Sequence, residues 1–489
     1  MLTKEDNELL CRVGPGAPMG EMLRQYWHPV LLSTELPERD CNPIRVRLLG
    51  EDLVAFRDSS GRPGMLADHC SHRGASLFFG RNEEGGLRCV YHGWKYDVDG
   101  GCIDMPNEPE PLPGDEAGAD ADDEASPLGA APRRFKDKVH HVAYPCAERG
   151  GVIWCYMGPR KEIPALPDIP WFLVPKGQLF ATKRLQENNF AQAIEGGIDT
   201  THASFLHTRL TLDLAMRREK DEKTNRTWGD DEGTNKGLSI AMKSKSARFE
   251  LLDTDYGIMI ASRREAGEDE IYWRINQFLF PYYTMPPSHR VVDRNSGQRG
   301  GGGGGHAFVP MDDENTITWS FTAKLDRPFT GEEIEHMLEY PNPGLHAGVP
   351  KGLLPATSEP MGAFRGIHNK RNDYGLDYEL QRTVQFCGIP DRSTQDNAIQ
   401  ESMGPIYDRA QEHLGVADSG VIHMRRRLIN SARALDEQGL TPPGVDSASS
   451  YCVTGCGFIL PKSETWITTA DELCRLRPGI DLQVEEIHA

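Results

Sequence analysis

The sequence lacks the features that mark membrane, secreted and nucleic-acid-binding proteins. No apolar run approaches the ~18 residues that a transmembrane helix needs, and the mean hydropathy is −0.53. The first six residues have neither the basic nor the apolar region of a signal peptide. Basic residues number 54 against 73 acidic ones, a formal net charge of −19. We therefore expect a cytoplasmic protein that binds neither nucleic acid nor membranes.

Disulfide scaffolding and dinucleotide binding are also unsupported. The eleven cysteines are an odd number scattered over 489 residues, which favours reduced thiols, some of them metal ligands. No dinucleotide loop of the G-x-G-x-x-G type, set between a strand and a helix, is present. The sequence therefore gives no sign that this chain binds a dinucleotide itself.

Composition divides the chain into three parts. Residues 1–45 are expected to form a segment that packs on the C-terminal domain, and residues 46–160 form a β-rich module. Residues 161–489 predict a larger domain with helices over an antiparallel sheet, so the fold class is α+β. Eight carboxylates between residues 108 and 124 predict a mobile insertion at 108–134, and the six glycines at 300–305 predict a flexible loop.

A first metal site is indicated by a C-x-H…C-x-x-H pattern. Cys70 and His72 are followed, after sixteen residues, by Cys89 and His92. Two thiolates and two imidazoles suit a tetrahedral zinc ion, or a [2Fe–2S] cluster of the Rieske type. The spacing alone leaves both alternatives open.

A second metal site is indicated by Asp199, His202 and His207 in a stretch with helical character from 188 to 207. On a regular α-helix the two histidines point ~140° apart. A π-bulge or local unwinding would bring them together. Asp199 precedes His202 by three residues and can hydrogen-bond it from the same helical face.

The residues around the first pattern, Cys70-Ser-His-Arg-Gly-Ala and Cys89-Val-Tyr-His-Gly-Trp, closely resemble the Rieske-domain signature. The resemblance implies a small antiparallel β domain with the cluster at the tips of two loops. It implies that Cys70 and Cys89 bind one iron, and that His72 and His92 bind the other. Cys102 lies outside the pattern and is interpreted as a structural thiol.

The second pattern resembles the catalytic domain of Rieske non-haem iron oxygenases. By this resemblance His202 and His207 bind a mononuclear Fe(II), and Asp199 connects the iron to a cluster. Asp396 is the expected third ligand, on a helix capped by Ser393 or Thr394; Glu401 is the alternative. Further segments between about residues 19 and 435 resemble the phthalate-dioxygenase-like branch.

That branch implies a homotrimer or a hexamer in which His92 faces the partner subunit's Asp199. Electrons would come from NADH through a separate flavin and iron–sulfur reductase. The implied reaction is hydroxylation, giving a cis-dihydrodiol, of an aromatic carboxylate such as a phthalate or benzoate by O2. Arg274 and Arg248, each on an expected strand, are candidates to bind the carboxylate.

Two other functions remain open at this point. The same iron site would also serve O-demethylation of a methoxylated aromatic acid. A Rieske electron-transfer protein would need only the first ~160 residues, and would leave His202, His207 and Asp396 without a function.

Overall fold

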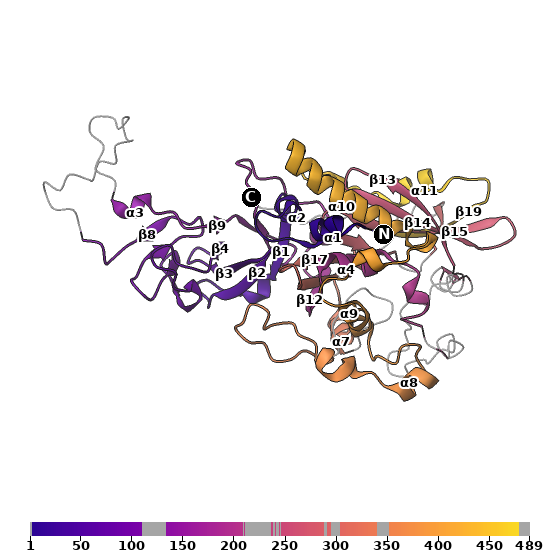
Figure 1. Ribbon diagram of the computed structural model, residues 1–489, viewed down its shortest axis with the longest axis horizontal. Coiled ribbons are helices and arrows are strands. Elements are labelled where there is room, and N and C mark those ends of the chain that lie inside the picture. Colours follow the sequence, from indigo (N-terminus) through magenta and orange to yellow (C-terminus); the bar gives the residue numbers. More distant parts are fainter. Residues whose placement is uncertain are drawn as a thin grey trace. The chain divides into compact units, whose positions relative to one another are not determined.

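The computed structural model describes residues 2–109, 134–208, 210, 236–237, 240, 244, 246–287, 291–294, 304–339 and 352–478. These residues form two compact units (Figure 1). The smaller unit comprises residues 28–157 with 358–360, and the larger unit comprises the rest. Most of the expected acidic insertion, and four of the six glycines at 300–305, lie outside the described residues.

The smaller unit consists of short antiparallel strands in three sheets, ordered β2-β3-β4-β9, β5-β6-β7-β8 and β1-β11-β10. It adds one short helix, α3 (Phe135–Lys138), and two 3₁₀ turns, η1 (Ser33–Glu35) and η2 (Leu77–Phe79). The strands are β1 (Trp27–Leu32), β2 (Ile44–Leu48), β3 (Glu51–Arg57), β4 (Pro63–Ala67), β5 (Arg81–Glu83), β6 (Gly86–Arg88), β7 (Lys95–Tyr96), β8 (Cys102–Asp104), β9 (Ala143–Tyr144), β10 (Cys146–Arg149) and β11 (Val152–Tyr156).

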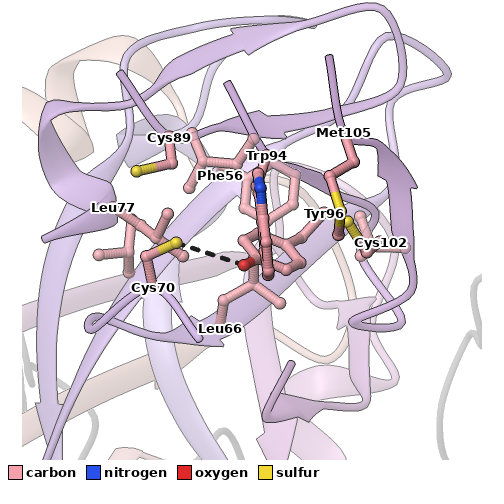
Figure 2. Close-up of a cluster of buried hydrophobic side chains, with 12 residues drawn as sticks. Phe56, Leu66, Cys70, Leu77, Cys89, Trp94, Tyr96, Cys102 and Met105 are labelled. Atoms are coloured by element: carbon pink, nitrogen blue, oxygen red, sulfur yellow. Dashed lines mark hydrogen bonds between the residues drawn. The ribbon is translucent and has the colours of Figure 1, made fainter. Parts of the chain in front are cut away.

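One buried apolar cluster of this unit lies around Trp94 and Tyr96, and it includes Cys70, Cys89 and Cys102 (Figure 2). The core therefore extends directly to the two loops that carry the first metal pattern. Residues 28–45 cluster with this unit, whereas the sequence had grouped them with the N-terminal segment, because β1 pairs with β11.

The larger unit is built on an eight-stranded antiparallel sheet of order β12-β18-β17-β16-β15-β14-β13, with β19 also paired to β15. The central strand β15 is buried along nearly its whole length, because its Ile, Tyr, Trp and Phe side chains are covered on both faces. The strands are β12 (Leu179–Gln186), β13 (Arg248–Asp253), β14 (Gly257–Glu265), β15 (Glu270–Leu279), β16 (Tyr283–Met285), β17 (Gly304–Pro310), β18 (Thr316–Ala323) and β19 (Cys456–Pro461).

Helices pack on this sheet, and α4 contacts its strands β15 to β18. The helices are α1 (Lys4–Cys11), α2 (Pro18–Leu23), α4 (Phe190–Ile198), α7 (Gly331–Glu339), α8 (Tyr378–Thr383), α9 (Arg392–Ser402), α10 (Ser419–Gln438) and α11 (Trp466–Cys474). The 3₁₀ turns are η3 (Pro170–Phe172), η4 (His202–Ser204), η6 (Lys370–Gly375), η7 (Arg409–Gln411), η8 (Val416–Asp418) and η9 (Ala448–Tyr451). Among the helices that the structure describes, none combines the length and apolar character that a bilayer crossing requires.

A buried ion cluster joins the helices. Glu195 of α4 accepts hydrogen bonds from Arg409 Nε at 2.9 Å and from Arg425 Nε at 2.8 Å. Arg425 lies on α10 and also pairs with Glu412. The cluster ties α4 to α10 and to η7, so it fixes the helix whose end reaches the second metal pattern.

The helix over 188–207 is shorter than the sequence predicted. Asn189 caps α4 by accepting a hydrogen bond from the Ala191 N–H, and the helix ends at Ile198. The Asp199 side chain then accepts hydrogen bonds from the Thr201 N–H at 2.6 Å and hydroxyl at 2.7 Å. Such a local turn competes with the helix, so the unwound alternative holds.

Candidate metal centres

The cluster loops bring together all four residues of the first pattern. The rings of His72 and His92 lie 4.4 Å apart between centroids, and His72 stacks on Trp94 at 4.3 Å. Cys70 and Cys89 are buried, whereas Val90 and Tyr91 at the loop tip are exposed. The thiols therefore lie inside and the histidines at the rim.

The donor atoms at these loops fit a cluster. Nδ1 of His72 is buried and has no hydrogen-bond partner among the described residues, a costly state for a polar atom that binds nothing. Burial and the neighbouring Cys70 thiol raise the pKa of Cys89, while the backbone N–H groups of Tyr91 and His92 oppose the rise. Those N–H groups point at a sulfur that a metal would hold as thiolate.

A tyrosine of the buried core contacts the loop that carries Cys70. The Tyr96 hydroxyl lies 3.2 Å from Cys70 Sγ (Figure 2). Cys102 lies in the same core, and its thiol faces the Asp104 carbonyl at 3.5 Å. Tyr96 was not singled out from the sequence, because a lone tyrosine on a short strand carries no pattern.

The second centre is formed by three residues from two segments far apart in the chain. His207 Nε2 lies 3.2 Å from His202 Nε2 and 3.3 Å from Asp396 Oδ1, and His202 Nε2 lies 3.8 Å from the same oxygen. Donor atoms about 2.1 Å from one ion lie roughly 3.0–3.5 Å from one another. Within the described residues, His202, His207 and Asp396 are the group found to have metal-binding geometry.

Asp199 supports His202 by a route that differs from the expected one. Asp199 is the C-cap of α4 with extended backbone angles, so it does not share a helical face with His202. Its Oδ2 nevertheless lies 3.5 Å from His202 Nδ1. Burial lowers the pKa of His202, but the Asp199 hydrogen bond and the Asp396 charge outweigh burial and raise it.

Asp396 is the fifth residue of α9. The N-cap of that helix is Asp391, not the predicted Ser393 or Thr394. Asp391 accepts hydrogen bonds from the Thr394 N–H and hydroxyl, at 3.0 and 2.7 Å. Burial raises the pKa of Asp396, but the charges of His207, His202 and Arg184 hold it well below its ordinary value. The carboxylate is thus ionised beside two imidazoles.

Glu401, the alternative ligand, is occupied elsewhere. Its two oxygens accept hydrogen bonds from the Tyr374 hydroxyl at 2.5 Å and from the Glu187 N–H at 3.1 Å. Burial raises its pKa. Asp396, which lies beside the two histidines, is therefore favoured over Glu401 as the carboxylate of the centre.

Two residues around this centre had no sequence signal. Gln395 places Oε1 2.7 Å from His207 Nδ1, and buried Arg184 lies close enough to Asp396 to lower its pKa. Arg184 donates its Nε–H to Asn397 at 3.0 Å. Gln395 immediately precedes Asp396 in the sequence, but neither Gln395 nor Arg184 belongs to a recognisable pattern.

The two candidate arginines lie in different surroundings. Arg274 is 9% exposed on β15. Two residues further along that strand, Asn276 donates to the Ile198 carbonyl at the end of α4. Arg248 is exposed at the start of the edge strand β13.

Comparison with known proteins matches both halves of the chain. Residues 26–115 match the family described as the Rieske [2Fe-2S] domain, and residues 155–482 match the family described as LigXa C-terminal domain like. The chain belongs to the Rieske oxygenases. It is an oxidoreductase subunit with a Rieske [2Fe–2S] domain and a catalytic domain for mononuclear iron, so the predicted fold class and both cofactors are confirmed.

Several relatives of this Rieske oxygenase cover nearly its whole length. It is 36% identical over 480 residues to the 3-chlorobenzoate-3,4-dioxygenase oxygenase subunit of Comamonas testosteroni, covering 96% of this chain and 98% of the relative. It is 34% identical to the phthalate 4,5-dioxygenase oxygenase subunit of Pseudomonas putida, covering 89% and 87%. The 5,5'-dehydrodivanillate O-demethylase oxygenase subunit of Sphingobium sp. (strain NBRC 103272 / SYK-6) is 30% identical, covering 88% and 80%.

A solved structure supports the fold alone. Dicamba monooxygenase bound to dicamba has a TM-score of 0.51 at 16% identity, covering 85% of this chain and 98% of that one.

Proposed function

We propose that this chain is the oxygenase component of a system that hydroxylates an aromatic carboxylate with O2. The convergence of His202, His207 and Asp396 in a chain with a Rieske domain carries the proposal. A ferredoxin-like carrier would have no use for this second donor set. The electron-transfer alternative is therefore disfavoured.

Each residue of the centre has a role that follows from its position. Two imidazoles and one carboxylate would hold Fe(II) and leave open positions, where the metal supplies reductive activation of O2. Asp199 orients the His202 ring through Nδ1 and leaves Nε2 directed at the centre. Cys70, Cys89, His72 and His92 would hold the [2Fe–2S] cluster.

Arg274 is the residue that we propose for binding the substrate carboxylate. Its Nη2 donates to the Pro287 carbonyl at 2.9 Å, while its buried Nε has no partner among the described residues. No carboxylate in the described part of the chain pairs with it. Desolvation lowers the pKa of Arg392, at the start of α9; Asp396 opposes this shift, and the nearby charge of Arg274 adds to it. A buried guanidinium group that pairs with no carboxylate in the described residues, with a second guanidinium group nearby, suits an anion.

The relatives' names agree with this substrate class, because benzoates and phthalates are aromatic carboxylates. The demethylase relative makes O-demethylation of a methoxylated aromatic acid the second candidate. Both reactions use the same donor set and the same anion site.

We further propose that a separate NADH-dependent flavin and iron–sulfur reductase supplies the electrons, and that the chain forms a homotrimer or a pair of trimers. Light scattering of the purified protein tests the assembly. Reduction of the cluster by NADH, with and without a surrogate reductase, tests the electron supply.

The deciding experiment identifies products by mass spectrometry. Iron-replete protein receives a surrogate reductase, NADH, ¹⁸O2 and a panel of phthalates, benzoates and methoxybenzoates. Two ¹⁸O atoms in a ring product establish dioxygenation, whereas formaldehyde with a phenolic product establishes demethylation. Absence of turnover on every acid, with the iron confirmed, contradicts the substrate class.

A matched pair of variants tests the anion site. Arg274→Met should raise KM for the acid by roughly 10- to 100-fold, the value of a lost charge-assisted hydrogen bond. Arg248→Met, at the exposed edge strand, should leave KM unchanged. An equal change in both variants contradicts the assignment of Arg274.

A further inference from the structure

The ring of His207 has distinct surroundings at its two nitrogens. Nε2 faces Asp396 and His202, at 3.3 and 3.2 Å. Nδ1 faces Oε1 of Gln395 at 2.7 Å. A metal-binding nitrogen must present a lone pair, so Nε2 needs to be unprotonated and Nδ1 must carry the proton.

The orientation of the Gln395 amide follows from its other partner. Its Nε2 donates to the Ile389 carbonyl at 2.8 Å. A carbonyl oxygen only accepts hydrogen bonds, so the nitrogen end of the amide faces Ile389 and the oxygen end faces His207. The side chain is 5% exposed, and its backbone N–H donates to Asp391 within the first turn of α9. The acceptor is therefore held in place from two sides.

The two histidines of the centre consequently have different supports. His202 is backed by the carboxylate of Asp199, whereas His207 is backed by a neutral amide. A carboxylate partner increases the basicity of an imidazole ligand more than an amide does. The centre already contains the negative charges of Asp199 and Asp396, which together balance a divalent ion. A third negative charge would exceed the positive charge of that ion.

We propose that Gln395 is a positioning residue of the iron centre: it holds His207 as the Nδ1–H tautomer and aims Nε2 at the metal without adding charge. The inference rests on the assignment of His202, His207 and Asp396 as iron ligands. It predicts that iron binding depends on an acceptor oxygen at position 395, independently of the stability of the fold.

The test compares Gln395→Leu with Gln395→Glu in the full-length protein with its cluster in place. Both variants remove the donor to Ile389, so both should lose stability in urea or thermal unfolding. Gln395→Leu also removes the acceptor, and its affinity for Fe(II) in chelator competition should fall by about 10- to 100-fold. Gln395→Glu keeps an acceptor oxygen and should recover most of that affinity.

Electron paramagnetic resonance supplies the second measurement. With the cluster oxidised and silent, the nitric oxide adduct of the mononuclear Fe(II) gives a signal whose rhombicity reports ligand geometry. Gln395→Glu should shift this rhombicity, because it adds charge behind His207. Gln400→Leu is the matched control. Gln400 is a buried amide on the same helix, and its Oε1 accepts a hydrogen bond from Gln186. Its loss should reduce the stability of the protein and leave the signal and the Fe(II) affinity unchanged.

The outcomes separate this inference from the proposed function. If the wild-type protein holds no iron beyond the cluster, the assignment of the iron ligands fails. If the wild type holds that iron but Gln395→Leu binds it equally well, the role of Gln395 is refuted. Parallel iron loss in Gln395→Glu and Gln395→Leu, in proportion to their stability, also refutes it.

Discussion

Replacing Glu195 by glutamine should destabilise α4 by about 3 kcal/mol. The Glu195 side chain is 15% exposed and accepts from Arg409 and Arg425, whose side chains are 0% and 3% exposed. Burial raises the pKa of Glu195, but the two guanidinium groups outweigh it and hold the pKa below the ordinary 4.5. The carboxylate is therefore ionised and pairs with two buried guanidinium groups.

The magnitude follows from the charges left behind. Each pair attracts by about 4 kcal/mol at 4 Å with an effective dielectric constant of ~20, and desolvation offsets much of this. Breaking a buried pair on one side costs about 3–5 kcal/mol. Glutamine keeps an acceptor oxygen, and Arg425 keeps Glu412, so we expect the lower end.

Hydrogen–deuterium exchange measures this loss locally, which avoids a global two-state assumption for a chain of two units. A loss of 3 kcal/mol should speed exchange of the α4 amides by about 150-fold. Glu8→Gln is the control, because Glu8 and Arg12 form an exposed i,i+4 pair worth about 0.3–0.5 kcal/mol.

The pH dependence gives a second test of the same reasoning. A carboxylate with a lowered folded pKa contributes stability that is complete above its unfolded pKa and declines as the pH falls through the folded value. The difference between wild type and Glu195→Gln should stay constant from about pH 8 to pH 5 and shrink at more acidic pH. Unchanged α4 exchange in the variant at neutral pH would refute the account of the ion cluster.

Three further changes probe the iron centre and its support. His207→Ala should remove one of the roughly three irons per chain and abolish turnover, with the visible spectrum of the cluster intact; loss of that spectrum would contradict two separate sites. Asp199→Asn should keep all the iron but slow oxidation of the cluster in stopped-flow single turnover, and an unchanged rate would argue against its role. Gly197→Ala places a Cβ 2.6 Å from the Phe308 ring, so we expect a loss of about 1–2 kcal/mol, seen as faster α4 exchange; Gly331→Ala, whose Cβ meets nothing within 4 Å, should be neutral.

Both metal patterns could be found in the sequence because short loops determine them. Cys70 and His72 lie in one loop, and Cys89 and His92 lie in another. Each pair is only two or three residues apart in the sequence, so its members stay close in the folded chain. The pair His202 and His207 was equally visible, and the unwinding that it requires was anticipated from helix geometry. The predicted length of the helix over 188–207 was wrong, because the turn at Asp199 ends α4 before the first histidine.

What the sequence could not supply were the contacts between distant segments. Gln395 meets His207 across 188 residues, and Glu195 meets Arg425 across 230. A glutamine or a glutamate on a helix has many possible partners, and only the packed structure selects one. The cap of α9 was misplaced by two or three residues for a related reason, since Asp391, Ser393 and Thr394 are all good capping residues.

The pairing of β1 with β11 has a consequence for the evolution of this architecture. Apart from residues 358–360, the smaller unit is a continuous insertion within the larger one, from His28 to Met157. Because its first and last strands are neighbours in one sheet, the two ends of the insert lie together. Such a module can be exchanged between homologous chains as a cassette, by two crossovers and with little strain at the joints. Chimaeras that carry a relative's residues at 28–157 would then combine one protein's electron carrier with another's substrate site.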